Sequence, residues 1–137
     1  MKAFLLSPKP FAVRMSFANL GRILWGLFFV ASGLFNLFVT LPSPELYRSF
    51  ADVNFFEFYR WLLLNIALPY ATIITSLVVI FELAIGALIL TKGNVVRYGL
   101  IGTCIWLLFI CPAMGWYTIW SPLLLLIPIA LLRYDYR

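Results

Sequence analysis

Four apolar stretches dominate this sequence and restrict what it can fold into. They run from about Asn19 to Val39, Pro69 to Leu90, Val95 to Cys111 and Trp116 to Leu132. A helix needs about 20 mainly apolar residues to cross a bilayer, and the last two stretches lie near the lower limit. We predict an all-α membrane protein, a bundle of four transmembrane helices in one domain of residues 1–137. A three-span alternative, in which the last stretch only re-enters the membrane, stays open.

The composition agrees with a membrane location and excludes several kinds of chemistry. Hydrophobic residues make up 64% of the chain and charged residues 11%, against about 45–50% and about 25% in soluble domains. The sequence has no histidine, the commonest ligand of several metals and the side chain that most readily transfers protons near neutral pH. Cys104 and Cys111 would lie about 10 Å apart on one helix, too far for a disulfide. We expect no catalytic residues and no metal site.

The basic residues predict an orientation. With four spans and both termini inside, only Arg48 and Arg60 fall on the outer side. Lys and Arg collect in short cytoplasmic loops, so this asymmetry predicts cytoplasmic N- and C-termini. No soluble stretch is long enough for a nucleic-acid-binding patch, so we expect no nucleic-acid partner. The predicted inner set is Lys2, Lys9, Arg14, Arg22, Lys92, Arg97, Arg133 and Arg137.

Turn-forming residues predict where the spans end. The run Lys92-Gly93-Asn94 follows the second stretch, so we expect a glycine stop and an Asn cap for the next helix. Pro112 and Gly115 predict a tight turn between the third and fourth spans. Pro122 and Pro128 predict a bend in the last helix, because proline removes a backbone hydrogen bond.

The connection from Leu41 to Leu68 is the only long one between the spans. Residues 45–64 mix aromatic with charged side chains, which is typical of one or two short helices lying at the headgroup level or folding over the bundle mouth. Anchoring in membrane lipids is the simpler interpretation, and docking of a partner subunit is the alternative. The candidates for partner docking are Phe55, Phe56, Phe58 and Trp61.

Small and weakly polar residues recur on one face of each of the first three spans. Residues three or four apart share a helix face, and glycine on such a face lets a neighbouring helix approach closely. The predicted helix-packing residues are Gly26, Gly33, Gly86 and Gly99. The predicted lining residues are Asn36, Thr75 and Thr103, and Trp106 shares the face of Thr103.

Glu82 is the one carboxyl that the apolar pattern places inside a span. A charged residue at the centre of a membrane helix costs roughly 2.5–3.5 kcal/mol, so Glu82 requires a partner or a proton. Arg22 on the first span is the predicted partner, reached by its long side chain. The pair has two interpretations: it fixes the rotation and register of two helices, or it forms a proton or ligand site.

The first and second spans resemble those of the DoxX-like family of membrane proteins. The resemblance rests on the run from Arg22 to Leu37, with Gly26, Gly33 and Asn36 in it, and on the run from Glu82 to Leu90 before Lys92-Gly93. It extends over about Leu20 to Leu132. It implies a four-helix protein of the bacterial inner membrane. Some members of the family are membrane subunits beside quinone-linked or sulfur-compound oxidoreductases, and many others have no assigned activity. Asn36 departs from the family pattern, which often has Lys or His there.

Two functional hypotheses follow from these patterns. The first is a non-catalytic accessory subunit of a larger membrane complex, one involved in electron transfer. The second is a small redox or transport component with a proton- or quinone-related site at Glu82 and Arg22. The expected partners are membrane lipids and other proteins of the complex. We predict no cofactor, and contact with a lipid, a quinone or a pigment stays open because aromatic and aliphatic walls leave no signature in the sequence.

Overall fold

The computed structural model describes residues 9–115 and 120–136, which form helices joined by short turns, with no strand among them. The prediction of an all-α fold is therefore confirmed. Two π-helical turns, η1 (Asn36–Thr40) and η2 (Leu63–Ala67), follow the first and third helices. The α-helices are α1 (Lys9–Phe35), α2 (Leu46–Asp52), α3 (Glu57–Leu62), α4 (Ala71–Leu90), α5 (Val95–Ala113), α6 (Ser121–Leu124) and α7 (Leu126–Leu131).

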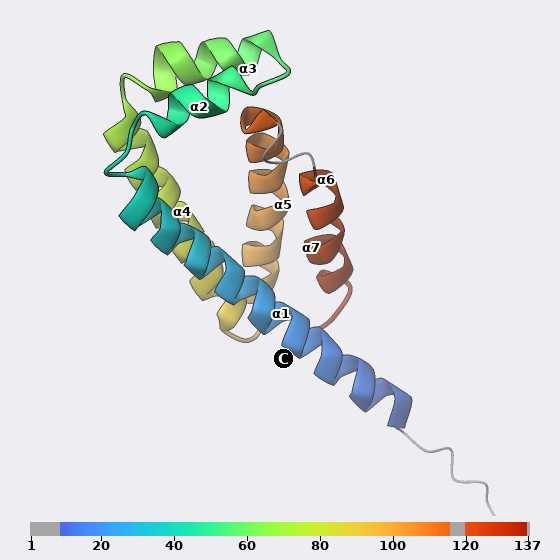
Figure 1. Cartoon of the computed structure of the whole chain (residues 1–137). Helices are drawn as coiled ribbons and strands as arrows, with labels where there is room; N and C mark the ends of the chain where they lie inside the picture. Colours follow the sequence, from blue (N-terminus) through green and yellow to red (C-terminus); the bar gives the residue numbers. More distant parts are fainter. Residues whose placement is uncertain (1–8, 116–119, 137) are drawn as a thin grey trace, which may run out of the picture.

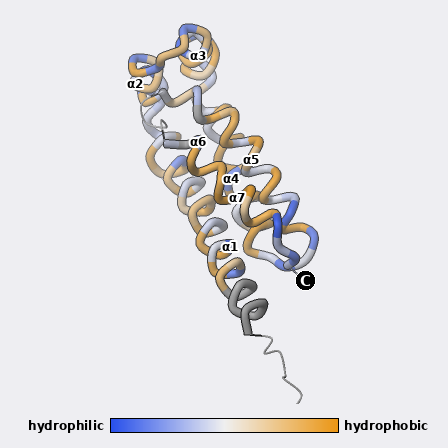
Figure 2. Tube along the Cα trace, turned by 90° about the vertical axis from the view of Figure 1, so that its right-hand side faces the viewer, coloured by the Kyte–Doolittle hydropathy of each residue, from blue (hydrophilic) through white to orange (hydrophobic). Residues whose placement is uncertain are grey.

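The helices α1 and α4 lie side by side and antiparallel, while α5 diverges from α4 and α7 runs beside α5 (Figure 1). The helices α2 and α3 lie across one end of this arrangement, and the turn between α4 and α5 lies at the other end with residue 136 (Figure 1). Hydrophobic residues follow the lengths of the long helices, and hydrophilic residues gather towards the two ends (Figure 2).

Among residues 9–115 and 120–136, two helical segments are long and apolar enough to cross a membrane, Phe17–Thr40 and Ala71–Leu90. Only 28% and 33% of their most apolar windows are buried, so most of their apolar surface faces outward. They match the predicted first and second spans. The apolar helices Val95–Ile110 and Pro122–Leu131 are shorter, so the finding is two candidate spans rather than four.

The last predicted span, residues 116–132, is described only from residue 120 onward. There the chain forms two short helices that meet at Leu125. Pro122 lies in the first turn of α6, where a missing N–H leaves no helical bond unmade. Pro128 lies inside α7 and lacks the N–H that a continuous helix would use. The interruption predicted for this helix is present at Leu125, before Pro128. Residues 121–131 would extend about 16 Å as a helix, roughly half of the hydrocarbon thickness.

The turn after α4 has the predicted glycine and the predicted cap residue. Gly93 has φ +78°, a conformation that residues other than glycine rarely adopt. Its N–H donates to the carbonyl of Tyr136 at 2.7 Å. Asn94 is the N-cap residue of α5, as predicted, but its side chain makes no capping hydrogen bond. The second predicted turn comes later than expected, because α5 continues through Pro112 and the positive φ, +54°, falls at Gly115.

All four predicted helix-packing glycines lie at close helix contacts. A Cβ atom on Gly86 would lie 3.0 Å from the carbonyl oxygen of Gly26 and 2.7 Å from a methyl carbon of Val30. Gly33 faces Leu83, Gly26 faces Leu90, and Gly99 faces Ile89, each with a side-chain carbon at 2.8–2.9 Å from such a Cβ. Glycine is what permits α1, α4 and α5 to approach this closely.

The predicted segment 45–64 contains two short helices, α2 and α3, as expected. Tyr47, Ala51 and Leu63 pack with the start of α4 in a small apolar cluster. The side chain of Asn54, between α2 and α3, donates to the carbonyls of Pro112 and Ala113 at 2.9 and 2.7 Å. The segment is thus bonded to the end of α5 as well as packed on α4.

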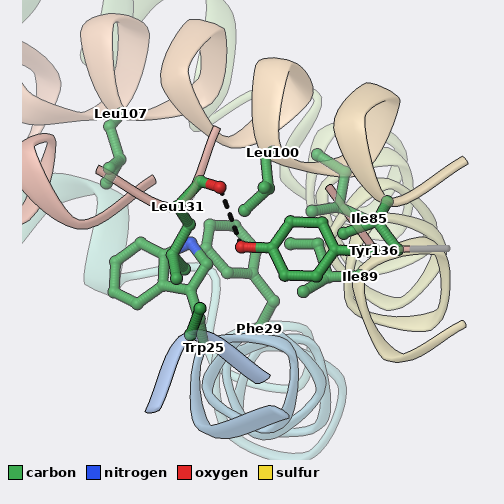
Figure 3. Close-up of a cluster of buried hydrophobic side chains, with 10 residues drawn as sticks. Trp25, Phe29, Ile85, Ile89, Leu100, Leu107, Leu131 and Tyr136 are labelled. Carbon is green, nitrogen blue, oxygen red and sulfur yellow. Dashed lines mark hydrogen bonds between the residues drawn. The ribbon is translucent and has the colours of Figure 1, made fainter. Parts of the chain in front are cut away.

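The main apolar cluster lies between α1, α4, α5 and α7, towards the end that holds the α4–α5 turn (Figure 3). Phe29, Ile89 and Leu100 are at most 2% exposed. Tyr136 closes the cluster, and its hydroxyl donates to the carbonyl of Leu131 at 2.8 Å (Figure 3). Tyr136, which follows α7, is therefore part of the core.

Candidate functional site

Glu82 lies in α4 between two other helices and is only 4% exposed. Three neutral groups donate hydrogen bonds to its carboxyl oxygens: the Ser32 hydroxyl at 3.0 Å, the Asn36 amide at 2.7 Å and the Trp106 indole N–H at 3.3 Å. Ser32 belongs to α1, Asn36 begins η1 and Trp106 belongs to α5. This cluster, Glu82 with its three donors, joins α1, α4 and α5 through one carboxyl group.

The orientation of two donors is itself fixed by further contacts. The Asn36 carbonyl oxygen accepts from the Thr40 hydroxyl at 2.8 Å, so the Asn36 NH₂ points to Glu82. The Trp106 ring lies against Phe81, with the ring centres 5.0 Å apart. These contacts limit the rotation of both side chains, and the Glu82 cluster is preorganised.

Arg22 bonds to the C-terminal end of α4 and not to Glu82. Its guanidinium donates to the carbonyl oxygens of Ile89, at 2.7 Å, and Thr91. These carbonyls belong to the C-terminal turn of α4, where the helix dipole favours a cation. The guanidinium carbon also lies 5.5 Å from the centre of the Tyr136 ring, within range of a cation–π contact.

The predicted pairing of Arg22 with Glu82 is wrong: these two side chains form no ion pair and have separate partners. The register of the antiparallel helices explains the difference. Gly26 faces Leu90 and Gly33 faces Leu83. The sequence numbers of an α1 residue and the α4 residue at the same level therefore add to 116. Glu82 is thus level with residue 34, which is twelve residues from Arg22. Twelve residues of helix extend about 18 Å, which an arginine side chain cannot cover.

The three predicted lining residues serve different contacts. Asn36 faces Glu82, as described above. Thr75 is buried and shares a hydrogen bond with the Tyr47 hydroxyl at 2.8 Å, which joins α4 to α2. Thr103 is also buried and bonds to the carbonyl of Gly99 at 3.0 Å, within its own helix. Thr75 and Thr103 therefore do not belong to the Glu82 cluster.

Two tyrosines outside the long apolar segments have raised pKa values. Burial raises the pKa of Tyr136 to about 12; the positive charge of Arg22 acts in the opposite direction, and Tyr134 adds a smaller increase. Burial also raises the pKa of Tyr47, against the effect of its hydrogen bond with Thr75. Both hydroxyl groups stay protonated at neutral pH and serve as hydrogen-bonding groups.

The predicted docking residues are on the surface of the α2–α3 end. Phe55, Phe56, Phe58 and Trp61 are 53–65% exposed. Tyr59 lies among them, with its ring 5.5 Å from that of Phe58. An aromatic surface of this kind suits either the membrane interface or another protein.

A groove of about 550 Å³ runs beside the Glu82 cluster, between α4 and α5. Its walls are apolar side chains of α4 together with Trp106 of α5. The indole N–H of Trp106 is bonded to Glu82, so the residue presents its apolar ring surface to the groove. The lining residues are Ile74, Leu77, Val78, Ile80, Phe81, Ala84 and Trp106.

The three partners of Glu82 were not predicted from the sequence. Ser32 lies one helical turn before Asn36, and that spacing places both on one face. Trp106 was assigned to the inward face of its helix, but no role followed from that assignment. Within residues 9–115 and 120–136, no three side chains of Cys, Asp or Glu gather where they could bind one metal ion.

Comparison of the chain with protein families, curated proteins and solved structures finds no match. The similarity to DoxX-like proteins therefore rests on the sequence motifs alone.

Proposed function

We propose that this protein is a non-catalytic accessory subunit of a larger membrane complex, anchored by four helical segments with both termini in the cytoplasm. The observation that carries the non-catalytic role is the bonding of Glu82. Its carboxyl group accepts hydrogen bonds from three neutral donors on neighbouring helices. A carboxyl held in this way fixes how α1, α4 and α5 pack, which is a structural role.

The exposure of the two long helices supports the membrane location. Leu77 and Ile80 of α4 are 61% and 64% exposed, and Phe38 in η1 is 72% exposed. A soluble protein rarely exposes such a continuous apolar surface. In a bilayer this apolar surface contacts hydrocarbon chains and not water, so its exposure does not destabilise the protein.

The position of Tyr136 supports an even number of crossings. The carbonyl of Tyr136 accepts a hydrogen bond from the N–H of Gly93 at 2.7 Å, and Arg22 bonds to Thr91. The start of the apolar segment Phe17–Thr40, the α4–α5 turn and Tyr136 therefore share one end of the apolar helices. Exposed Lys92, Arg97 and Arg133 lie near this end, which favours the cytoplasmic side.

The aromatic surface around Trp61 supports the proposal that another protein binds this chain. Tyrosine, phenylalanine, tryptophan and arginine are enriched in protein interfaces, and this surface combines several of them with Arg60. The involvement of the complex in electron transfer rests on the DoxX-like motifs.

Purification under mild detergent from native membranes, followed by mass spectrometry of the retained proteins, tests the accessory role. We expect a defined set of membrane proteins to be retained with the wild type and lost when Phe58 and Trp61 are replaced by Ser. A Phe38→Ser variant is the control, since Phe38 is also exposed but lies outside the α2–α3 surface. Recovery of the chain alone, as monomer or homo-oligomer, in several detergents would contradict the proposal.

Thiol labelling tests the topology independently. In a variant without native cysteines, Arg60→Cys should react with a membrane-impermeant reagent on intact cells. Lys92→Cys and Arg133→Cys should react only after the membrane is opened. Labelling of Arg133→Cys on intact cells would instead support three crossings.

A further inference from the structure

The groove between α4 and α5 has the size and chemistry of a binding site for hydrocarbon. It extends along α4 from Ile74 to Ala84, about 15 Å at the rise of an α-helix. Its volume of about 550 Å³ lies within the range of about 300–1,000 Å³ that is usual for small-molecule sites. The one polar side-chain atom among its lining residues, the indole nitrogen of Trp106, is bonded to Glu82. A ligand with a polar group inside the groove would find no side chain to bond with.

The groove is narrower than a helix, so a helix could enter it only with part of its surface. Dividing its volume by its length gives a mean cross-section of roughly 37 Å². An α-helix with its side chains is about 10–12 Å across, which corresponds to roughly 80–110 Å². An extended hydrocarbon chain is much narrower than a helix and has no polar groups along its length.

The surroundings of the groove indicate where the occupant comes from. Leu77 and Ile80 line the groove and are also among the most exposed residues of α4. The groove is thus continuous with the surface that the proposed function places in contact with lipid. An apolar groove that stays empty loses dispersion contacts along its walls, so chains of the bilayer would fill it.

We propose that the α4–α5 groove holds an acyl chain of a membrane phospholipid, packed along Leu77 and Ala84 and against the ring of Trp106. The proposal rests on the membrane location in the proposed function and not on the identity of any complex. The Glu82 cluster contributes by holding Trp106 in one orientation, so the groove has a fixed wall. The lipid then supports the contact between α4 and α5 where the two helices diverge.

A matched pair of substitutions on α4 tests the proposal. Ala84→Phe places a ring in the groove, whereas Ala87→Phe places the same ring on an exposed position of the same helix that does not line the groove. The full chain is purified, passed through repeated exchange into a short-chain detergent, and assayed by mass spectrometry for phospholipid that stays bound. We expect phospholipid to be retained by the wild type and by Ala87→Phe, with retention about tenfold lower, equivalent to about 1.4 kcal/mol, in Ala84→Phe.

Fluorescence quenching detects the acyl chain beside Trp106 in a protein whose groove is not blocked by a substitution. In nanodiscs of phosphatidylcholine brominated on its acyl chains, the fluorescence of Trp106 is obtained as the difference between the wild type and Trp106→Phe. We expect it to be strongly quenched, and less quenched in Ala84→Phe than in Ala87→Phe. Equal retention and equal quenching in the two Ala variants would show a surface film of lipid only and overturn the proposal.

Failure of this inference is distinguishable from failure of the proposed function. A chain recovered in the soluble fraction would contradict the membrane location before any lipid is measured. Loss of the protein partners with retained phospholipid would contradict the accessory role and leave the lipid site standing. A Trp106 signal that is not quenched in the wild type would contradict the lipid site alone.

Discussion

Replacement of Glu82 by Gln is the most informative perturbation of this protein, because it removes the ability of this side chain to ionise and keeps its shape. The Gln carbonyl can accept from Ser32 and Trp106 as the carboxyl does. Its NH₂ group would face the NH₂ of Asn36, but rotation of the Asn36 amide by 180° presents an oxygen instead. Thr40, which now donates to Asn36, would then accept, as a hydroxyl group can.

The size of the effect follows from the hydrogen bonds that each variant loses. Interhelical hydrogen bonds in a membrane protein contribute about 0.6 kcal/mol each on average. Glu82→Ala leaves three donors without their acceptor, so we expect a loss of about 2 kcal/mol in the free energy of unfolding. Glu82→Gln affects one bond, and we expect a loss of less than about 1 kcal/mol.

Unfolding of the full chain in bicelles, followed by circular dichroism as sodium dodecyl sulfate is added, measures both variants. Glu57→Gln on α3 is the control for loss of a carboxyl charge at an exposed position. The reasoning is refuted if Glu82→Gln is as unstable as Glu82→Ala, because the charge itself would then be required. It is also refuted if Glu82→Ala is as stable as the wild type.

Three further predictions concern other contacts. Gly86→Ala should destabilise the protein by about 1–3 kcal/mol, because the new Cβ atom would contact backbone atoms of α1. Gly102→Ala is the control, because the atom nearest to its Cβ, at 3.0 Å, is the end of a flexible side chain. This variant should change the unfolding free energy by less than about 1 kcal/mol. Asn54→Ala should lower the unfolding free energy by about 1–3 kcal/mol, measured in the same assay, because two hydrogen bonds to the end of α5 are lost. The raised pKa of Tyr136, about 12, means that the unfolded chain loses this proton at lower pH than the folded chain. The contribution of Tyr136 to stability is therefore complete below about pH 10 and lost as the pH rises to about 12. The tyrosinate absorbance of wild type minus Tyr136→Phe should show a midpoint near 12, and a midpoint near 10 would contradict the burial of this hydroxyl.

The sequence predicted the local features of the fold well, because short-range chemistry determines them. The second span was expected at about 69–90 and forms α4 at Ala71–Leu90. Gly93 was expected to end that helix and does so with a positive φ. The glycines of the inward faces lie at helix contacts as predicted. Each of these features depends on the residues of one turn or one helix face, which the sequence displays directly.

The partners of the buried charges could not be predicted in the same way, because they depend on the axial register between two helices. Glycine pairs such as Gly26 with Gly86 fix that register through close backbone approach, and each residue of shift moves a facing side chain by about 1.5 Å. With facing numbers adding to 116, Arg22 lies beside the end of α4 and Glu82 lies between Ser32 and Asn36. Alignment of Gly26 with Gly86 alone places Glu82 level with residue 30, so Arg22 and Glu82 are already separated by eight residues, about 12 Å, along the helices. For a helical pair of this kind, the small residues determine which polar residues meet, and the polar residues then bond to whatever that register brings to them.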